Sequence, residues 1–468
     1  MRLTRRELLA GAAAGALGAA GAYELVDRLT SSPERASGVP RQPEQHLLEG
    51  LRVVLDNEVE VVAPPLHHQV VTAKLRVEPT RKALREARAA LEDALAGLDA
   101  RYEPTPGGLG VTVGWGLPYF RRYVPQLADR HIPVDLRASK TKEQQTRAVI
   151  DAIRFPSDPE GLVLEQNDVA VLLRSDSRDH VADGAEAIFK DLRGLFDLTS
   201  IRKGFAGGGF GGERSLPKEM ALAAGVPGAD LIPDTAELFL GFTSTQKAGL
   251  GPPRIANFET LGYTRPGYFT QGTSMHISHI FEDLEAWYLN FDFRERVDTI
   301  FRPNLAVRPG TQTVRQAAKD VASSHAVAHD FHRFGVIGHS AGIQPTSRLS
   351  RDILGADGTL YKEGTAVPHR ADFNTLDNPF FWSSKPGVDS QSQEPAAGVH
   401  FVVFNPTSDD FHRNRLAMDG VLPDGTRLPF QPRARGQGIN SVLVATHRQN
   451  FLVPPRRHRS FPLVELIR

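Results

Sequence analysis

The sequence contains no cysteine, and its charges cancel. None of the 468 residues is a cysteine, which excludes disulfide bonds, thiolate nucleophiles, iron–sulfur clusters and thiolate-bound metal cofactors. Any metal ion must therefore be bound by histidine, carboxylate or tyrosine side chains. The 55 Lys and Arg residues balance 55 Asp and Glu residues. No overall positive charge would attract nucleic acid, so we expect no nucleic-acid partner.

The bulk composition is that of an ordinary globular protein. Hydrophobic residues make up 40% of the chain and charged residues 24%, which is typical of soluble domains. The length is sufficient for two or three domains of usual size.

The first residues resemble an export signal. Arg5-Arg6 precedes an apolar run rich in Ala and Gly that ends near Ala22, as in twin-arginine signals. The run is too short for a comfortable membrane span. A chance arginine pair before a helix, or a retained anchor, is the alternative. We predict a signal at 1–30 read by the twin-arginine export machinery, a flexible linker at 31–50, and a periplasmic or extracellular location.

Hydrophobic periodicity predicts two helix–strand units in the first half. Alternating residues predict strands at 67–77, 109–116, 168–173 and 200–205. Thr80 is a suitable N-cap for a helix whose leucines 84, 91, 95 and 98 share one face. A second helix is expected at 180–196. The order β-α-β, β-α-β is that of a ferredoxin-like domain.

A glycine-rich stretch at 204–212 divides the two halves. It lacks the Gly-Lys-Ser/Thr of a phosphate loop, so we interpret it as a flexible connection. A second series follows, with strands expected at 275–281, 398–404 and 441–453 and helices at 283–301 and 408–418. We therefore predict an α+β protein with an N-terminal ferredoxin-like domain at 51–210 and a second one at 211–468.

Two residues in the weakly periodic segment 302–395 have a chemistry of interest. His339 follows an apolar run, and Arg351 comes twelve residues later. A neutral imidazole is a good axial ligand for haem iron. An arginine stays charged and can stabilise an anion or a developing negative charge.

This segment resembles the haem-ligand region of the dye-decolourising (DyP-type) peroxidases, with His339 in the place of the proximal histidine and Arg351 in that of the distal arginine. Three further fragments resemble segments of that family in the same order: 109–116, 272–287 and 398–404. The resemblance implies two ferredoxin-like domains in a dimeric α+β barrel-like architecture. It also implies haem b in the second domain near Phe404, His339 as the iron ligand, and hydrogen peroxide and a bulky reductant as substrates.

The sequence departs from that family at its Gly-x-x-Asp-Gly motif. The matching stretch begins at Gly241, Phe242 and Thr243, and Ser244 stands where the family has aspartate. The resemblance places the first three residues at the cofactor and makes Ser244 and Arg351 the catalytic candidates. A serine hydroxyl is not a useful base at neutral pH. We expect weak turnover, or a haem-binding or haem-handling protein without catalysis.

A non-haem metal site is the remaining alternative. His325, His329 and His332 are spaced to share one face of a helix and could bind Zn²⁺ or Cu²⁺. The segment lacks the glutamate of His-Glu-x-x-His, and a polar helix face explains the same pattern. Three tryptophans are expected either in the core or as relays for oxidising equivalents: Trp115, Trp287 and Trp382.

Overall fold

The structure is a computed structural model that describes residues 38–56, 59–207, 214–242, 252, 254–306, 322–378 and 395–468. The predicted export signal, Thr243, Ser244 and Trp382 lie outside these residues.

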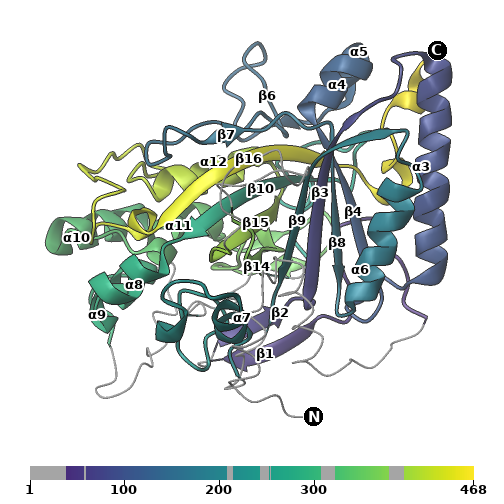
Figure 1. Cartoon of the computed structure of the whole chain (residues 1–468). Helices are drawn as coiled ribbons and strands as arrows, with labels where there is room; N and C mark the ends of the chain where they lie inside the picture. The colour runs from purple at the N-terminus through teal and green to yellow at the C-terminus, as the bar shows by residue number, and fades with distance from the viewer. Residues whose placement is uncertain are drawn as a thin grey trace.

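The described chain is a mixture of strands and helices (Figure 1). The strands are β1 (Arg52–Asp56), β2 (Val59–Ala63), β3 (His67–Leu75), β4 (Gly110–Gly116), β5 (Val134–Asp135), β6 (Thr146–Arg147), β7 (Val163–Leu164), β8 (Val169–Ser175), β9 (Phe196–Phe205), β10 (Thr273–Glu282), β11 (Ile353–Leu354), β12 (Leu360–Tyr361), β13 (His369–Arg370), β14 (Phe373–Thr375), β15 (Gly398–Asn405) and β16 (Leu443–Val453). The α-helices are α3 (Arg81–Arg101), α4 (Leu117–Tyr123), α5 (Pro125–His131), α6 (Arg178–Ala185), α7 (Leu216–Ala224), α8 (Leu284–Asn290), α9 (Phe293–Ile300), α10 (Ser324–Phe334), α11 (His339–Ser347) and α12 (Ser408–Ala417).

The first half has the predicted ferredoxin-like topology. Its strands are ordered β9-β3-β8-β4, and every neighbouring pair is antiparallel. Helix α3 begins where its sequence indicates, because the Thr80 hydroxyl accepts a hydrogen bond from the Ala83 N–H at 3.3 Å. The expected leucine face of α3 is buried against the sheet.

The second half repeats the same topology. Its strands are ordered β16-β10-β15-β14, again with antiparallel neighbours. Helices α8, α9 and α11 lie between β10 and β14 in the chain, and α12 lies between β15 and β16. The α+β class and the pair of ferredoxin-like units are therefore confirmed.

The two units close into one ring of strands. Strand β4 pairs with β16, where Trp115 lies opposite Leu452, and β9 pairs with β14, where Phe205 lies opposite Asn374. Figure 1 shows the strands in the middle, with α3 and α6 on one flank and α8 to α11 on the other. The barrel-like architecture expected from the sequence is thus present within a single chain.

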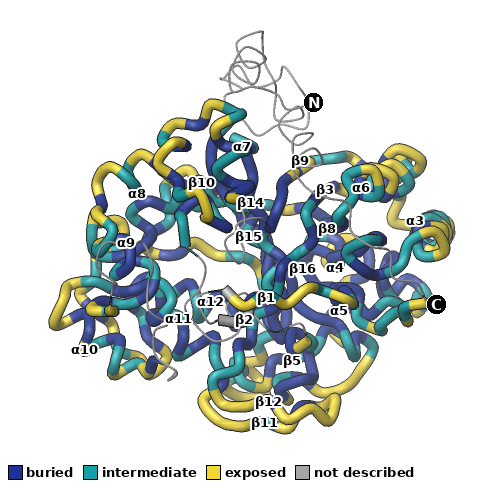
Figure 2. Tube along the Cα trace, turned by 90° about the horizontal axis from the view of Figure 1, so that it is seen from below, coloured by how far each residue is buried: buried dark blue, intermediate teal, exposed yellow. Residues whose placement is uncertain are grey.

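Strand alternation sorts the core into an outer and an inner part. Val71 and Val171 point outward, toward α3, while Val70 and Leu172 point into the ring. Both halves contribute to the inner cluster, Phe404 and Phe451 coming from the second. Figure 2 shows this buried centre and the exposed outer turns.

Several expectations are corrected. The segment 45–48 is buried rather than a free linker, and the Gln45 side chain donates to the Pro454 carbonyl at 2.7 Å. The helix expected at 283–301 is two helices, because Asp292 forms a capping box that starts α9. Strand β9 begins at Phe196 rather than at residue 200.

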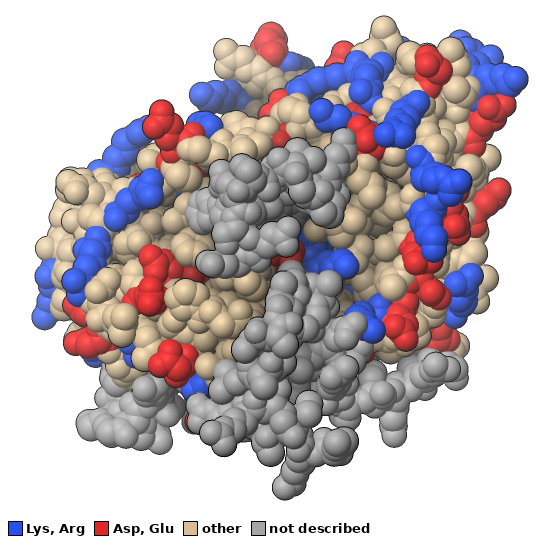
Figure 3. All heavy atoms as spheres, viewed as in Figure 1, with Lys and Arg blue, Asp and Glu red and all other residues tan. Residues whose placement is uncertain are grey.

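Two surface properties complete the description. Figure 3 shows acidic and basic side chains interspersed over the visible face, as expected for a chain without net charge. Among the described residues, no helix has the length and apolar character needed to cross a membrane.

Candidate functional site

A cavity of about 270 Å³ lies in the second half, between the sheet and its helices. We call it the large cavity. Strands β10, β15 and β16 form one wall, and α9, α11 and α12 contribute to the others. Strand alternation selects the lining: Ser278 and Ile280 face the cavity, whereas Ile277 faces the inside of the ring. Its volume is near the lower end of the range for ligand cavities, roughly 300 Å³.

His339 is the first residue of α11 and lines the large cavity. The preceding Gly338 allows the helix to begin in contact with the end of α9, since a Cβ there would lie 2.4 Å from the Phe301 carbonyl oxygen. Burial, together with the nearby charges of Arg370 and Arg415, lowers the pKa of His339 to about 4. The imidazole is therefore neutral at physiological pH. Its Nδ1 is enclosed and has no partner among the described residues.

Arg370 and Asp372 form an ion pair in the wall of the large cavity. The Arg370 Nε and Nη2 atoms donate to the two Asp372 carboxylate oxygens at 3.0 and 2.8 Å. Although burial opposes the charge, this carboxylate raises the pKa of Arg370 above its ordinary value. A bidentate pair fixes the plane of the guanidinium. The cavity thus contains a permanent, oriented cation.

Glu282, at the end of β10, is a second carboxyl group of the large cavity. Burial and, to a smaller extent, the negative charge of Asp372 raise its pKa to about 8. Its Oε2 atom is enclosed and has no partner within the described part of the chain. At neutral pH Glu282 is therefore mostly protonated, so it can donate a proton to a ligand.

Three further arginines line the large cavity. Arg448 makes a bidentate pair with Asp158 at 2.7 and 2.8 Å, and Arg415 lies 2.9 Å from an oxygen of Asp419. Arg348 ends α11, and burial together with the charge of Arg370 lowers its pKa to about 10. Arg448 and Arg415 are paired with carboxylates, whereas Arg348 keeps its charge at neutral pH, so Arg348 is the side chain of these three that suits an anionic group.

The glycine–phenylalanine segment predicted at the cofactor lies beside the large cavity. Phe242 lines it and packs on Phe301, with ring centroids 5.4 Å apart. Gly241 has a φ of +85°, and a Cβ there would lie 2.8 Å from the Tyr288 hydroxyl. Only glycine fits this turn without strain. The next two predicted residues, Thr243 and Ser244, lie outside the described chain.

The predictions for Arg351 and Phe404 are not supported by their positions. Arg351 is exposed on the turn before the β11–β12 hairpin, which Figure 2 shows at the exposed margin, and it does not line the large cavity. Arg370 occupies the cavity instead. Phe404 faces the inside of the ring against His46 and His369, because alternation along β15 turns its neighbours Val403 and Asn405 toward the cavity.

The alternative metal site is not formed. His325, His329 and His332 lie on one exposed face of α10. Among the described residues, no group of three or more His, Asp or Glu side chains is arranged to bind a metal ion. The polar-face explanation of this pattern is the one that the structure supports. Trp115 and Trp287 are fully buried core residues, and their indole N–H groups donate to backbone carbonyls.

The sequence did not indicate Arg370, Asp372 or Glu282. Arg370 and Asp372 carry opposite charges at positions i and i+2, a spacing that puts both on one face of a strand. That spacing was the available signal. Glu282 comes one residue after the predicted strand at 275–281 and ends the observed strand β10, where it is in phase with Ser278 and Ile280 and shares their face.

Comparisons with known proteins give one family and a set of solved structures. The model of a "Family of unknown function (DUF7405)" matches residues 65–455. No curated protein matches the chain.

Among solved structures, the chain is similar to the DyP-type peroxidase from Cellulomonas bogoriensis, at 17% identity and a TM-score of 0.48 over 89% of this chain and 96% of that one. It is also similar to DtpA from Streptomyces lividans, at 16% identity and a TM-score of 0.48 over 88% and 96% of the two chains. The encapsulated DyP-type peroxidase from Mycobacterium smegmatis gives 14% identity and a TM-score of 0.47 over 85% and 95%. Similarity at this level assigns no activity, and the fold described above rests on its own strand order.

Proposed function

The chain belongs to DUF7405, a family of unknown function, and we propose that it is a haem b protein of the DyP type that oxidises a reductant with hydrogen peroxide, with weak turnover. The observation that carries the proposal is the neutral imidazole of His339 at the wall of a cavity that also contains Arg370. The sequence fragments that resemble the DyP-type family, met in the same order along the chain, support the same function.

The residues of the large cavity fit a haem group. A neutral imidazole is the form that coordinates iron, and low pKa keeps His339 in that form. The walls include apolar side chains from three elements, Phe242, Ile343 and Phe401, which suit the faces of a macrocycle. Haem also carries two carboxylates, and Arg348 is a charged, half-buried partner for one of them.

Within this proposal each side chain has a separate task. Bound haem supplies the iron at which the oxygen–oxygen bond of peroxide is broken. His339 would hold the metal. Arg370, fixed by Asp372, stabilises negative charge that develops on peroxide oxygen. Glu282 holds a proton at neutral pH and can deliver it to a leaving oxygen.

The first prediction is that His339→Ala abolishes haem ligation. Wild-type protein reconstituted with haem should show a Soret band, and the variant should lose or strongly shift it, because the proposed iron ligand is gone. His332→Ala, an exposed histidine on α10, is the matched control and should leave the spectrum unchanged. An unchanged Soret band in the His339 variant would reject this ligand.

The second prediction separates Arg370 from Arg351. Arg370→Met should slow the spectral response of the reconstituted protein to peroxide by about 10²–10³-fold, as for the loss of one electrostatic stabiliser. Arg351→Met, at an exposed position, should react like the wild type in the same stopped-flow measurement. Equal rates in both variants would remove Arg370 from the proposed mechanism.

A haem-binding or haem-handling protein without efficient turnover is the second candidate. It is favoured by the carboxyl groups of the large cavity: Glu282 is mostly protonated at neutral pH and Asp372 is tied to Arg370. Neither is therefore a free base. The His339→Ala experiment tests binding alone, and peroxide addition to the wild type then decides between the two candidates.

A further inference from the structure

A second, smaller cavity lies near a buried arginine that the proposed function does not use. Arg174 is on β8, where Ala170 and Leu172 face the inside of the ring and Val171 and Leu173 face outward. Alternation therefore points Arg174 inward. It is only 2% exposed to solvent.

Within the described part of the chain, Arg174 has no anionic partner. Its Nη2 atom donates to the His46 carbonyl oxygen at 2.6 Å, and its Nε atom is enclosed without a partner in the described residues. Burial lowers its pKa to about 10, so the guanidinium is still charged at neutral pH. Two other buried arginines each have a carboxylate: Arg202 with Glu165 and Arg448 with Asp158.

A buried charge without a counter-ion is strongly unfavourable even after relaxation of the protein. The neighbouring side chains do not compensate it. Burial lowers the pKa of both His68 and His369 to about 3, and the charge of Arg174 contributes to each shift. These rings are therefore neutral at physiological pH. The Nδ1 of His369 is enclosed and lacks a partner among the described residues, so in the matching tautomer it can donate to an anion.

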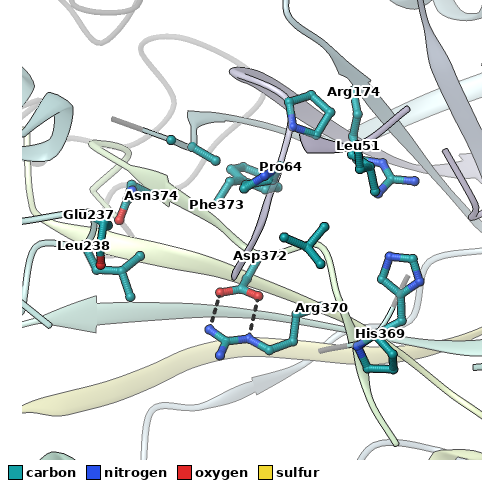
Figure 4. Close-up of a pocket in the computed structure, with 15 residues that line it drawn as sticks. Leu51, Pro64, Arg174, Glu237, Leu238, His369, Arg370, Asp372, Phe373 and Asn374 are labelled. Carbon is teal, nitrogen blue, oxygen red and sulfur yellow. Dashed lines mark hydrogen bonds and ion pairs between the residues drawn. The ribbon is translucent and has the colours of Figure 1, made fainter. Parts of the chain in front are cut away.

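The small cavity, of about 40 Å³, is lined by both Arg174 and His369. Figure 4 shows these two on the same side of the cavity, with the Arg370–Asp372 pair between them and Glu237. One water needs about 10–15 Å³ measured in this way. The space therefore admits an ion or a molecule of a few atoms, and no larger ligand.

We propose that Arg174 and His369 form a binding site for a small monovalent anion, such as a halide or formate, inside the ring of strands. Positive charge and a neutral ring N–H donor are present on one side of the cavity, and the carboxylates that also line it are those of Glu237 and of Asp372, which is paired with Arg370. The apolar part of the wall includes Leu51, Val62 and Phe373. His339 does not line this cavity, although Arg370 and Asp372 line both cavities, and the proposed anion binding does not require haem.

The test is the thermal stability of the full-length protein in sodium chloride, bromide, formate and gluconate at equal ionic strength. Chloride, bromide or formate should raise Tm by about 1–3 °C in a saturable manner, because an anion that binds only the folded state stabilises it. Gluconate, which is too large for the small cavity, serves as the reference.

Arg174→Met should abolish the difference between small anions and gluconate. Its Tm in gluconate should equal or exceed that of the wild type, because an apolar side chain of similar length removes the buried charge. Arg457→Met, an exposed arginine, should retain the anion effect. Identical curves for all four salts in the wild type would overturn the proposal.

A crystal of the unmodified protein grown in sodium bromide gives a second readout that does not require a variant to fold. An anomalous bromide peak within contact distance of the Arg174 guanidinium is expected. A peak absent there, with water only beside Arg174, would overturn the proposal as well.

Discussion

Glu282 shows how position alone changes the chemistry of one carboxyl group. The same side chain on the surface would be ionised at neutral pH, whereas burial and the nearby Asp372 raise its pKa to about 8. In the folded protein Glu282 therefore stays mostly protonated at neutral pH. Since the unfolded chain binds that proton only below the ordinary value of 4.5, folding and protonation are linked.

The third prediction follows from this linkage. Between pH 4.5 and about 8, unfolded Glu282 is ionised while the folded form is neutral, so its contribution to stability is complete at low pH and is lost as pH rises. The loss is at most about 1.4 kcal/mol per pH unit. Glu282→Gln should remove it, so the variant should gain Tm over the wild type at pH 8 and not at pH 4.

Glu285→Gln is the matched control, because Glu285 is exposed on the neighbouring helix α8. It should follow the wild-type dependence of Tm on pH. A Glu282 variant whose Tm runs parallel to that of the wild type from pH 4 to 8 would show that Glu282 titrates normally.

Among the elements, α11 is the one that positions the candidate ligand, and its start is set by a close contact. Gly338 is the N-cap residue just before the helix, and a Cβ there would meet the Phe301 carbonyl oxygen at 2.4 Å and the Arg302 Cα at 2.5 Å. Both are backbone atoms and cannot move aside at low energetic cost. His339 therefore has its position because residue 338 has no side chain.

The fourth prediction is that Gly338→Ala destabilises the protein by about 1–3 kcal/mol, the usual cost of overpacking, and weakens haem binding by displacing His339. The measurements are urea unfolding and a haem titration. Gly97→Ala on α3 is the control: its Cβ would meet nothing within 4 Å, and it should stabilise by up to about 1 kcal/mol. Equal stability of both variants would contradict the contact.

The helices and strands that the sequence predicted are those long enough to show a hydrophobic periodicity, which arises because one face packs against the core. Alternation revealed β3 and β15, and the leucine period with Thr80 revealed α3, because burial of one face imposes these periods. Strand β13 has two residues, too few for any period. Its position depends on pairing with Phe404, far along the chain. Arg370 was missed for that reason.

Arg351 was predicted as the distal arginine from its spacing after His339 and from the family resemblance. That spacing places Arg351 at the cavity only if the chain runs directly from the helix back to the sheet. The chain instead passes through the exposed β11–β12 hairpin before it returns to the sheet. Asp352, next to Arg351, is bound there by Lys362 at 2.7 Å. The chain therefore returns to the wall of the large cavity at Arg370, later in the sequence than the prediction of Arg351 assumed.

At the scale of the whole molecule, the two halves do not separate at the predicted boundary near residue 210. The buried tail after β16 contributes Phe461, Leu463 and Val464 to the core of the first half. Arg459 also pairs with Asp99 of α3 at 2.7 Å. The repeated topology was predictable because the strands and helices of each half have their own hydrophobic periodicity. The packing of the C-terminal tail on the first half was not predictable, because it leaves no local periodicity in the sequence.

The fifth prediction concerns where the protein is located. We propose that the protein is exported by the twin-arginine route. Replacing Arg5 and Arg6 with lysines should retain the protein in the cytoplasm, because the paired arginines are the recognised feature. Cell fractionation and immunoblotting measure this. Continued export of the double variant would indicate another route.

Closure of the ring by β16 also sets the order of events during synthesis. A ribosome releases the chain from its N-terminus, yet β4 and β10 share a partner, residues 443–453, that is synthesised after both of them. The β4 edge of the first ferredoxin-like unit therefore stays unpaired until more than 300 further residues have been added to the chain. During synthesis the ring of strands can close only once β16 has left the ribosome.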